Sequence, residues 1–164
     1  MTIFVKNKHT LQIDEFKFKC CIGKKGTTSN KKEGDKKTPK GTFEIENLYF
    51  RKDRKQKPIT SLKCIEIKKY MGWCDDINFP KKYNKLVKIN NNIKHEKLKR
   101  RDSKYDLLIP IKYNFKKSLI GKGSCIFIHL TNNYKPTEGC VALKEKDFLI
   151  MLKLINKNSK IKII

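Results

Sequence analysis

Apolar and polar residues alternate along much of this chain, and a period of two is typical of β-strands with one buried face. The alternation is clearest near the start, where residues 2–5 and 10–13 are expected to form a hairpin. Residues 16–20 repeat the pattern and predict a third strand. Further strands are expected at 41–46, 64–67, 105–109, 125–129 and 160–164.

One segment near the C-terminus has helical periodicity instead. Its apolar residues recur at spacings of three and four, which places them on one face of a helix. These residues are Phe148, Met151, Leu152 and Ile155. The sequence therefore predicts one helix, from Lys144 to Asn156.

Three polar segments have no clear periodicity and are expected to be irregular. Residues 23–42 are rich in glycine and proline, 51–60 are basic, and 72–104 are expected to be an excursion with little regular structure. No internal repeat or change in composition marks a second domain, and 164 residues suffice to bury one core. The expected fold is mainly β with one helix, as a single domain over 1–164.

The formal net charge of +24 has two interpretations. It favours attraction to a polyanion such as nucleic acid, anionic lipid or an acidic wall polymer. It also fits a composition in which Lys serves wherever a polar residue suffices, because only 4 of the 40 basic residues are Arg. The arginines do not cluster along the sequence beyond Arg100–Arg101, so we expect no specific nucleic-acid site.

The six cysteines do not form a metal-binding pattern, because none lie in a CxxC pair. We expect no metal and no cofactor, and most of these cysteines are expected to be small buried residues. No apolar run approaches the ~20 residues that a membrane span needs. Residues Met1–Lys6 are too short and too mixed for the core of a signal peptide, so neither a transmembrane segment nor an export signal is expected.

A histidine and a cysteine stand at positions suited to nucleophilic catalysis. His129 ends an expected strand, and Cys140 follows eleven positions later in a turn that Pro136 introduces. A thiol with a pKa of about 8.5 becomes an effective nucleophile beside an imidazole base, which can then protonate the leaving group. Gly139 leaves room for backbone N–H groups to approach an oxyanion. A buried structural role for both side chains is the alternative.

Three motifs resemble the YkuD-type L,D-transpeptidase family and occur in the family's order. A strand-end histidine followed by a Ser/Thr-x-Gly-Cys turn is matched by His129 and by Thr137–Cys140. The family's Gly-Asp-x-x-Thr-Pro-x-Gly-x-Phe turn is matched by residues 34–43. Short segments that resemble an uncharacterised branch of the family are 72–76, 83–84, 95–96, 105–107 and 121–124. The likeness extends from about Cys20 to Ile155.

The resemblance implies a role for each residue of the turn. Cys140 would be the nucleophile and His129 its base, the N–H groups of Gly139 and Cys140 would hold the oxyanion, and Thr137 would shape the turn. The implied substrate is a peptidoglycan stem tetrapeptide, which loses D-alanine and forms a thioester that an amine then resolves. That substrate implies the periplasm or cell envelope, with the cytoplasm as the alternative location.

Two departures from better-known members concern the surface that reads the substrate. Those members have His before the Gly and Arg two residues after the Cys, where this chain has Glu138 and Ala142. The candidates to line the cleft from the variable insert are Trp73, Asp75, Asp76, Tyr83, His95 and Asp106. Acidic side chains among them would suit a substrate with a free amine. A core position for Trp73, a turn or cap for Asp75–Asp76 and a solvated charged face for His95 are the structural alternatives.

Two other functions compete with transpeptidation. The same Cys/His pair would serve an L,D-carboxypeptidase or another amidohydrolase. A small basic β-domain that grips a polyanion without chemistry is the second rival, and it predicts exposed aromatic residues interleaved with Lys. Five phenylalanines occupy periodic, core-like positions instead, namely Phe16, Phe18, Phe43, Phe127 and Phe148.

Overall fold

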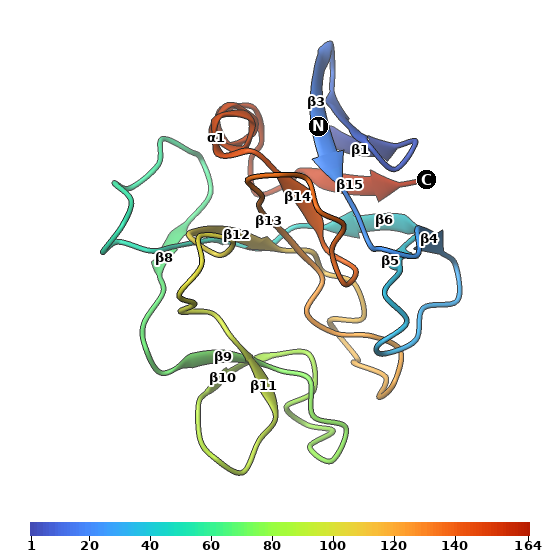
Figure 1. The fold of residues 1–164 in the computed structure, drawn as a ribbon, viewed down its shortest axis with the longest axis vertical. Helices are drawn as coiled ribbons and strands as arrows, with labels where there is room; N and C mark the ends of the chain where they lie inside the picture. The colour runs from blue at the N-terminus through green and yellow to red at the C-terminus, as the bar shows by residue number, and fades with distance from the viewer.

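A single curled sheet of ten strands forms the body of the protein in the computed structural model, which describes residues 1–164 (Figure 1). In spatial order its strands are β6 (Gly41–Glu44), β15 (Lys160–Ile163), β1 (Thr2–Lys6), β2 (Thr10–Ile13), β3 (Phe16–Cys21), β14 (Val141–Leu143), β13 (Phe127–Leu130), β12 (Leu107–Pro110), β7 (Leu48–Phe50) and β8 (Cys64–Glu66). A minor pair joins β4 (Thr27–Thr28) to β5 (Thr38–Pro39). The mainly β fold class is confirmed.

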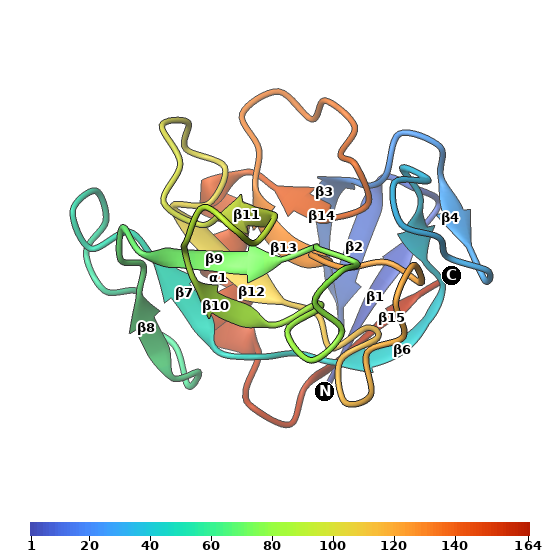
Figure 2. The same cartoon turned by 90° about the horizontal axis from the view of Figure 1, so that it is seen from below.

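The first three strands form the predicted hairpin and its extension. Val5 lies opposite Leu11, and Leu11 lies opposite Phe18, so alternate side chains point to one buried face. The last strand, β15, pairs in parallel with β1 and places the two ends of the chain in neighbouring strands (Figure 2). Phe16 departs from the core-like position expected for it, because its side chain is 50% exposed and its ring stacks on Phe18.

One helix, α1 (Glu145–Leu154), packs on the sheet. It begins one residue later and ends two residues earlier than the periodicity predicts. Phe148, Met151 and Leu152 are fully buried on its inner face, where they join a core of 25 residues. No helix in the molecule combines the length and apolar character needed to cross a membrane.

The prediction of little regular structure for 72–104 was wrong. A small sheet forms there, in the order β10 (Leu86–Lys88), β9 (Met71–Cys74) and β11 (His95–Lys97). The strands of this sheet read Met-Gly-Trp-Cys, Leu-Val-Lys and His-Glu-Lys, and none of them alternates between apolar and polar residues. We call residues 67–104 the insert, and it covers one face of the main sheet in front of β12 and β13 (Figure 2).

Strand β13 contributes side chains to both faces of the main sheet. Ile128 and Leu130 point into the large core, while Phe127 belongs to a second cluster of eight buried residues under the insert. Because successive side chains of a strand point to opposite faces, His129 lies on the same face as Phe127. The histidine therefore faces the insert rather than the helix.

Candidate active site

Neighbouring parallel strands bring His129 and Cys140 to one cavity. In the register of β13 and β14, His129 lies opposite Ala142, and Cys140 immediately precedes β14. Both side chains line a cavity of about 610 Å³, and its other walls include parts of the insert, residues 31–34, residues 124–126 and the 130–139 loop. The fold thus places the predicted nucleophile and base at the same opening.

The turn before Cys140 is fixed by side-chain and backbone hydrogen bonds. The Thr137 hydroxyl donates to the carbonyl of Cys140 at 2.6 Å and accepts from the N–H of Gly139 at 3.1 Å. The backbone N–H of Thr137 donates to the carbonyl of Ile22 at 2.9 Å, which anchors the turn beside the end of β3. Thr137 therefore shapes this turn, as the family resemblance implies.

Gly139 occupies a conformation that a side chain would strain. Its φ is +148°, and a Cβ at this position would lie 3.0 Å from the carbonyl oxygen of Lys37. The segment that supplies Lys37 is held in turn by Thr38, whose hydroxyl accepts the N–H of Gly23 at 2.8 Å. The Thr-Pro turn and the Gly-Cys turn thus pack against each other, and glycine keeps the backbone beside the thiol open.

The Cys140 thiol is in its neutral form in this structure. Its Sγ donates to the carbonyl of Cys125 at 3.2 Å and accepts the N–H of Phe127 at 3.4 Å. Only 8% of the residue is exposed, and this burial raises the pKa of the thiol to about 12. The burial and the hydrogen bond to a carbonyl therefore both favour the neutral thiol over the thiolate.

The imidazole of His129 is neutral as well. Burial lowers its pKa to about 4, an effect that the hydrogen bond to Leu130 only partly offsets. Nδ1 lies 2.8 Å from the carbonyl oxygen of Leu130, and a carbonyl can only accept, so the ring proton is on Nδ1. Nε2 is left unprotonated, with no partner in the protein, and no hydrogen bond joins the ring to Cys140.

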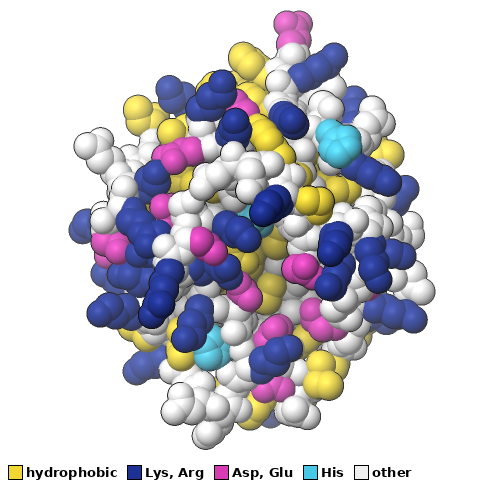
Figure 3. Space-filling view, in the orientation of Figure 1, with side chains coloured by type: hydrophobic (Ala, Val, Ile, Leu, Met, Phe, Trp, Pro, Cys, Tyr) yellow, Lys and Arg dark blue, Asp and Glu magenta, His cyan; other side chains and the backbone are white.

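The cavity has walls of both charges. Four basic residues line it together with four carboxylate residues, namely Lys31, Arg100, Lys104 and Lys135 with Glu33, Asp75, Glu96 and Glu138. A hollow with hydrophobic atoms at its floor and charged side chains around it is visible near the centre of the face in Figure 3. The site can therefore hold a substrate that carries both a free amine and carboxylates.

Asp75 is the one candidate from the insert that lines this cavity. Its Oδ1 is buried without a partner, and its Oδ2 lies 3.4 Å from the ammonium of Lys94. Asp76, its neighbour, instead accepts backbone N–H groups from Asn78 and Lys94 at 2.9 Å each. Asp75 therefore keeps one unpaired carboxylate oxygen next to the cavity, while Asp76 has the turn-stabilising role that was its structural alternative.

The other four candidates do not line the cavity. Trp73 and Tyr83 are buried, and the Tyr83 hydroxyl donates to Glu33, whose Oε2 also accepts from Ser124. Asp106 pairs with Arg54 at 3.0 Å. The ring of His95 packs close to Gly72, and its Nε2 is buried without a partner. These side chains can influence the cavity only through the residues that they hold.

Glu138 and Ala142, which stand where better-known family members have His and Arg, occupy different environments in the structure. The Glu138 side chain is 75% exposed and lies 3.7 Å from the Lys36 ammonium, at the rim of the cavity. Ala142 is fully buried in β14 opposite His129 and also lines the cavity.

Asn84 is a residue whose role the sequence did not reveal. Its Oδ1 accepts from the Trp73 indole at 3.0 Å and from the backbone N–H of Cys125 at 3.1 Å. Its amide donates to the carbonyls of Tyr113 and Asn114. Asn84 thus connects the insert to the backbone that accepts the Cys140 thiol, and its φ of +56° is a conformation that asparagine tolerates.

Comparison with known proteins gives one family match. The model of the YkuD family, described as the L,D-transpeptidase catalytic domain, matches residues 1–163. No curated protein and no solved structure matches the chain. No group of three or more His, Cys, Asp or Glu side chains is arranged to hold a metal ion.

Proposed function

Because this chain belongs to the YkuD family of L,D-transpeptidase catalytic domains, we propose that it is a cysteine acyltransferase acting on peptidoglycan stem peptides. In this proposal Cys140 attacks the carbonyl between the third and fourth residues of a stem tetrapeptide. The cell envelope is the proposed place of action, since that is where the family's substrate lies. Cell-wall cross-linking or remodelling is the proposed outcome.

One observation carries the proposal: a thiol and an imidazole with an unoccupied Nε2 line the same cavity. The lowered pKa of His129 keeps the ring neutral near pH 7, so the lone pair of Nε2 is free to accept a proton. The raised pKa of Cys140 means that a free thiolate does not accumulate. Proton transfer is therefore proposed to accompany attack rather than to precede it.

The acylation step follows from these positions. The S–H turns from the Cys125 carbonyl toward Nε2 of His129, and sulfur bonds to the substrate carbonyl carbon while Nε2 takes the proton. The backbone N–H groups of Gly139 and Cys140 are proposed to stabilise the oxyanion. Collapse breaks the C–N bond, the imidazolium protonates the departing D-alanine amine, and a thioester remains on Cys140.

The second half-reaction restores the enzyme. An acceptor amine gives a proton to Nε2 of His129 and attacks the thioester carbonyl, and the C–S bond breaks to return the thiol. Asp75 is proposed to attract the substrate or acceptor amine, with Glu33 and Glu96 adding to the negative potential of the same cavity. Trp73, Asp76, Tyr83, His95 and Asp106 are then supports of the cavity wall.

Mass spectrometry of muropeptides tests this function directly. Purified protein is incubated with sacculi that contain tetrapeptides, and Cys140→Ala serves as the control. New 3→3 cross-links are the expected product, whereas tripeptides alone would show that water is the acceptor and that the enzyme is a carboxypeptidase. An unchanged muropeptide profile with the wild-type protein would contradict the proposal.

A further inference from the structure

All four arginines of the chain line a single groove. Its volume is about 410 Å³, and we call it the arginine groove; it is lined by Arg51, Arg54, Lys69, Ile89, Lys97, Lys99, Arg100 and Arg101. Seven of these eight residues are cations, in a chain that uses Lys for the other 36 of its 40 basic residues. The sequence showed only Arg100–Arg101 together, and folding adds the two arginines of the 51–54 turn.

Some of the clustered arginines stabilise the fold. The Arg51 guanidinium donates to the carbonyl of Arg100 at 2.7 Å, and the Arg54 guanidinium donates to the carbonyls of Arg101 and Asp102. A planar fork with several donors can bridge successive carbonyls in this way, which a lysine ammonium cannot do as well. These bonds hold residues 100–102 against the 51–54 turn and fix the groove in shape.

The groove keeps excess positive charge after its internal ion pairs are counted. Asp53 pairs with Arg51 and Lys99, Asp106 pairs with Arg54, and the pair Glu96 and Asp102 contacts Arg100. Seven cations less these four carboxylates leaves a charge of +3. The cations without an ion pair are Lys69, Lys97 and Arg101, and all three are exposed.

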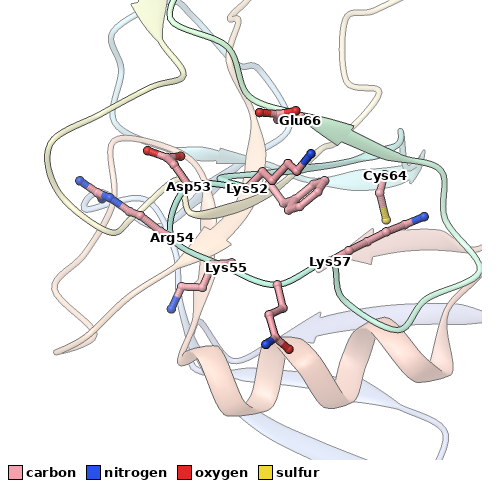
Figure 4. A pocket seen from close by; sticks show the side chains of 9 residues that line it. Lys52, Asp53, Arg54, Lys55, Lys57, Cys64 and Glu66 are labelled. Atoms are coloured by element: carbon pink, nitrogen blue, oxygen red, sulfur yellow. The ribbon is translucent and has the colours of Figure 1, made fainter.

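The arginine groove adjoins the catalytic cavity. Arg100 lines both, and its guanidinium lies 4.9 Å from the centre of the Tyr105 ring, which is itself 5.4 Å from the His129 ring. At its other side, Arg54 also lines an open groove of about 680 Å³ where Lys52, Lys55 and Lys57 project (Figure 4). A line of cations therefore leads from the proposed active site onto the surface.

We propose that the arginine groove binds carboxylates of the peptidoglycan strand whose reacting end occupies the catalytic cavity. The identity of the strand rests on the proposed function; the anion-binding groove itself rests on its charge and shape. The Arg101 guanidinium and the ammonium groups of Lys69 and Lys97 are free to pair with carboxylates, and an extended strand leaving the cavity would pass Arg100 first. Ile89 is the only uncharged lining residue and no aromatic ring lines the groove, which disfavours stacking of nucleotide bases.

A pair of charge-matched variants tests the groove without relying on activity. The groove variant is Lys69→Gln/Lys97→Gln/Arg101→Gln, and the control is Lys17→Gln/Lys160→Gln/Lys162→Gln, exposed lysines of β3 and β15. Each lowers the net charge from +24 to +21. Both are made in Cys140→Ala protein and titrated with labelled tetraglutamate, tripolyphosphate and a short single-stranded oligonucleotide. The groove variant is expected to bind tetraglutamate roughly tenfold more weakly at about 0.1 M salt, with the control within about twofold.

Two results would overturn the carboxylate groove. Equal weakening in both variants would mean that tetraglutamate responds to net charge alone. Selective loss of tripolyphosphate or oligonucleotide binding, with tetraglutamate unaffected, would assign the groove to a phosphate-bearing ligand instead.

The link to the substrate has its own measurement. In active protein, the groove variant is expected to raise KM for peptidoglycan several-fold while kcat on a minimal soluble tetrapeptide stays unchanged. An unchanged KM would show that the bound carboxylates are not those of the substrate. If wild-type protein has no activity on sacculi, the proposed function fails, and the tetraglutamate titration still decides whether the groove binds carboxylates.

Discussion

The large core and the small cluster under the insert differ in what holds them together. The large core has 25 buried residues between the main sheet and α1, and its members are aliphatic, aromatic or cysteine side chains. The small cluster has eight, and one of them is Cys140. Polar groups hold the surroundings of the small cluster, among them the Asn84 amide and the Glu33 carboxylate.

One side of the main sheet therefore stabilises the fold, and the other side carries the groups proposed to do the chemistry. Strand β13 faces the large core with Ile128 and Leu130, and the small cluster with Phe127 and His129. The apolar side fixes the position of the strand, because apolar burial is the main driving force of folding. The other side can then carry a neutral imidazole and a neutral thiol whose pKa values are shifted by the same burial.

The largest expected effect is on the small-cluster side. We expect Cys140→Ala to lower turnover by about 10⁴-fold or more, because a nucleophile cannot be replaced by its neighbours. The free energy of unfolding should fall by about 1–3 kcal/mol, because the Phe127 N–H loses its sulfur acceptor. Muropeptide turnover and thermal unfolding of the same preparation check both parts, and full turnover in this variant would refute the mechanism.

Cys125→Ala is the matched control for that experiment. Cys125 also lines the cavity, but the structure uses its backbone carbonyl, which the substitution preserves. We expect this variant to remain active. A carbapenem, as a strained acyl donor, should add to the Cys125→Ala protein and not to Cys140→Ala when the intact masses are measured.

The second largest effect is expected in the large core and on stability alone. Phe148 is fully buried on the inner face of α1, and Phe148→Ala removes the whole ring from a close-packed site. We expect the free energy of unfolding to fall by about 3–5 kcal/mol. Turnover per folded molecule at low temperature should stay near the wild-type value. A large loss of turnover in the folded fraction would show that the two sides are coupled.

Sequence periodicity predicts the large core better than the insert, and the reason is physical. The strands of the first hairpin alternate in burial, and α1 repeats its apolar residues at helical spacing, as in Phe148 and Met151. The strands of the insert do not alternate, as in the His-Glu-Lys of β11, and polar side chains such as Asn84 organise them. Neither a strand without alternation nor a side chain that joins several hydrogen bonds leaves a periodic signal.

The same contrast applies to the candidate site. His129 and Cys140 could be chosen from local motifs because the turn chemistry around them is local, with Thr137 and Gly139 within three residues of Cys140. The cavity wall depends on which face each insert side chain presents, so Asp75 lines it while Tyr83 does not. Arg51 and Arg100 are far apart in the sequence and meet only in the tertiary structure, so the sequence does not reveal that they cluster.

A smaller effect should appear in the pH dependence of stability. His129 has a pKa of about 4 when folded and 6.5 when exposed, so the unfolded chain binds a proton between these values and the folded protein does not. The free energy of unfolding therefore has its full value, as far as His129 affects it, above pH 6.5, and it falls as the pH drops toward 4. The loss attributable to this residue is about 3 kcal/mol, because one pKa unit corresponds to about 1.4 kcal/mol.

Denaturant titrations at several pH values measure that slope. In His129→Asn the part of the slope between pH 4 and 6.5 should disappear. His9→Gln is the control, because His9 is exposed and far along the chain from the cavity. An identical slope in wild type and His129→Asn would mean that the imidazole is not held neutral by burial.

The smallest expected effect joins the two regions through Asn84. Asn84→Ala leaves the Trp73 indole and the Cys125 N–H without their acceptor, which should cost about 2 kcal/mol of stability. Because the Cys125 carbonyl accepts the Cys140 thiol, we also expect turnover per folded molecule to fall by about tenfold. Asn91→Ala, at an exposed position of the insert, is the control and should leave both values unchanged.

The alkylation rate of Cys140 separates a positioning role for Asn84 from a purely structural one. In the Cys125→Ala background at fixed pH, loosening the Cys125 backbone should free the thiol and change the rate at which iodoacetamide modifies Cys140. If Asn84→Ala lowers stability while turnover and alkylation stay at their wild-type values, the insert only covers the sheet. If both change together, the insert sets the position of the nucleophile, and the small cluster is part of the active site rather than a second core.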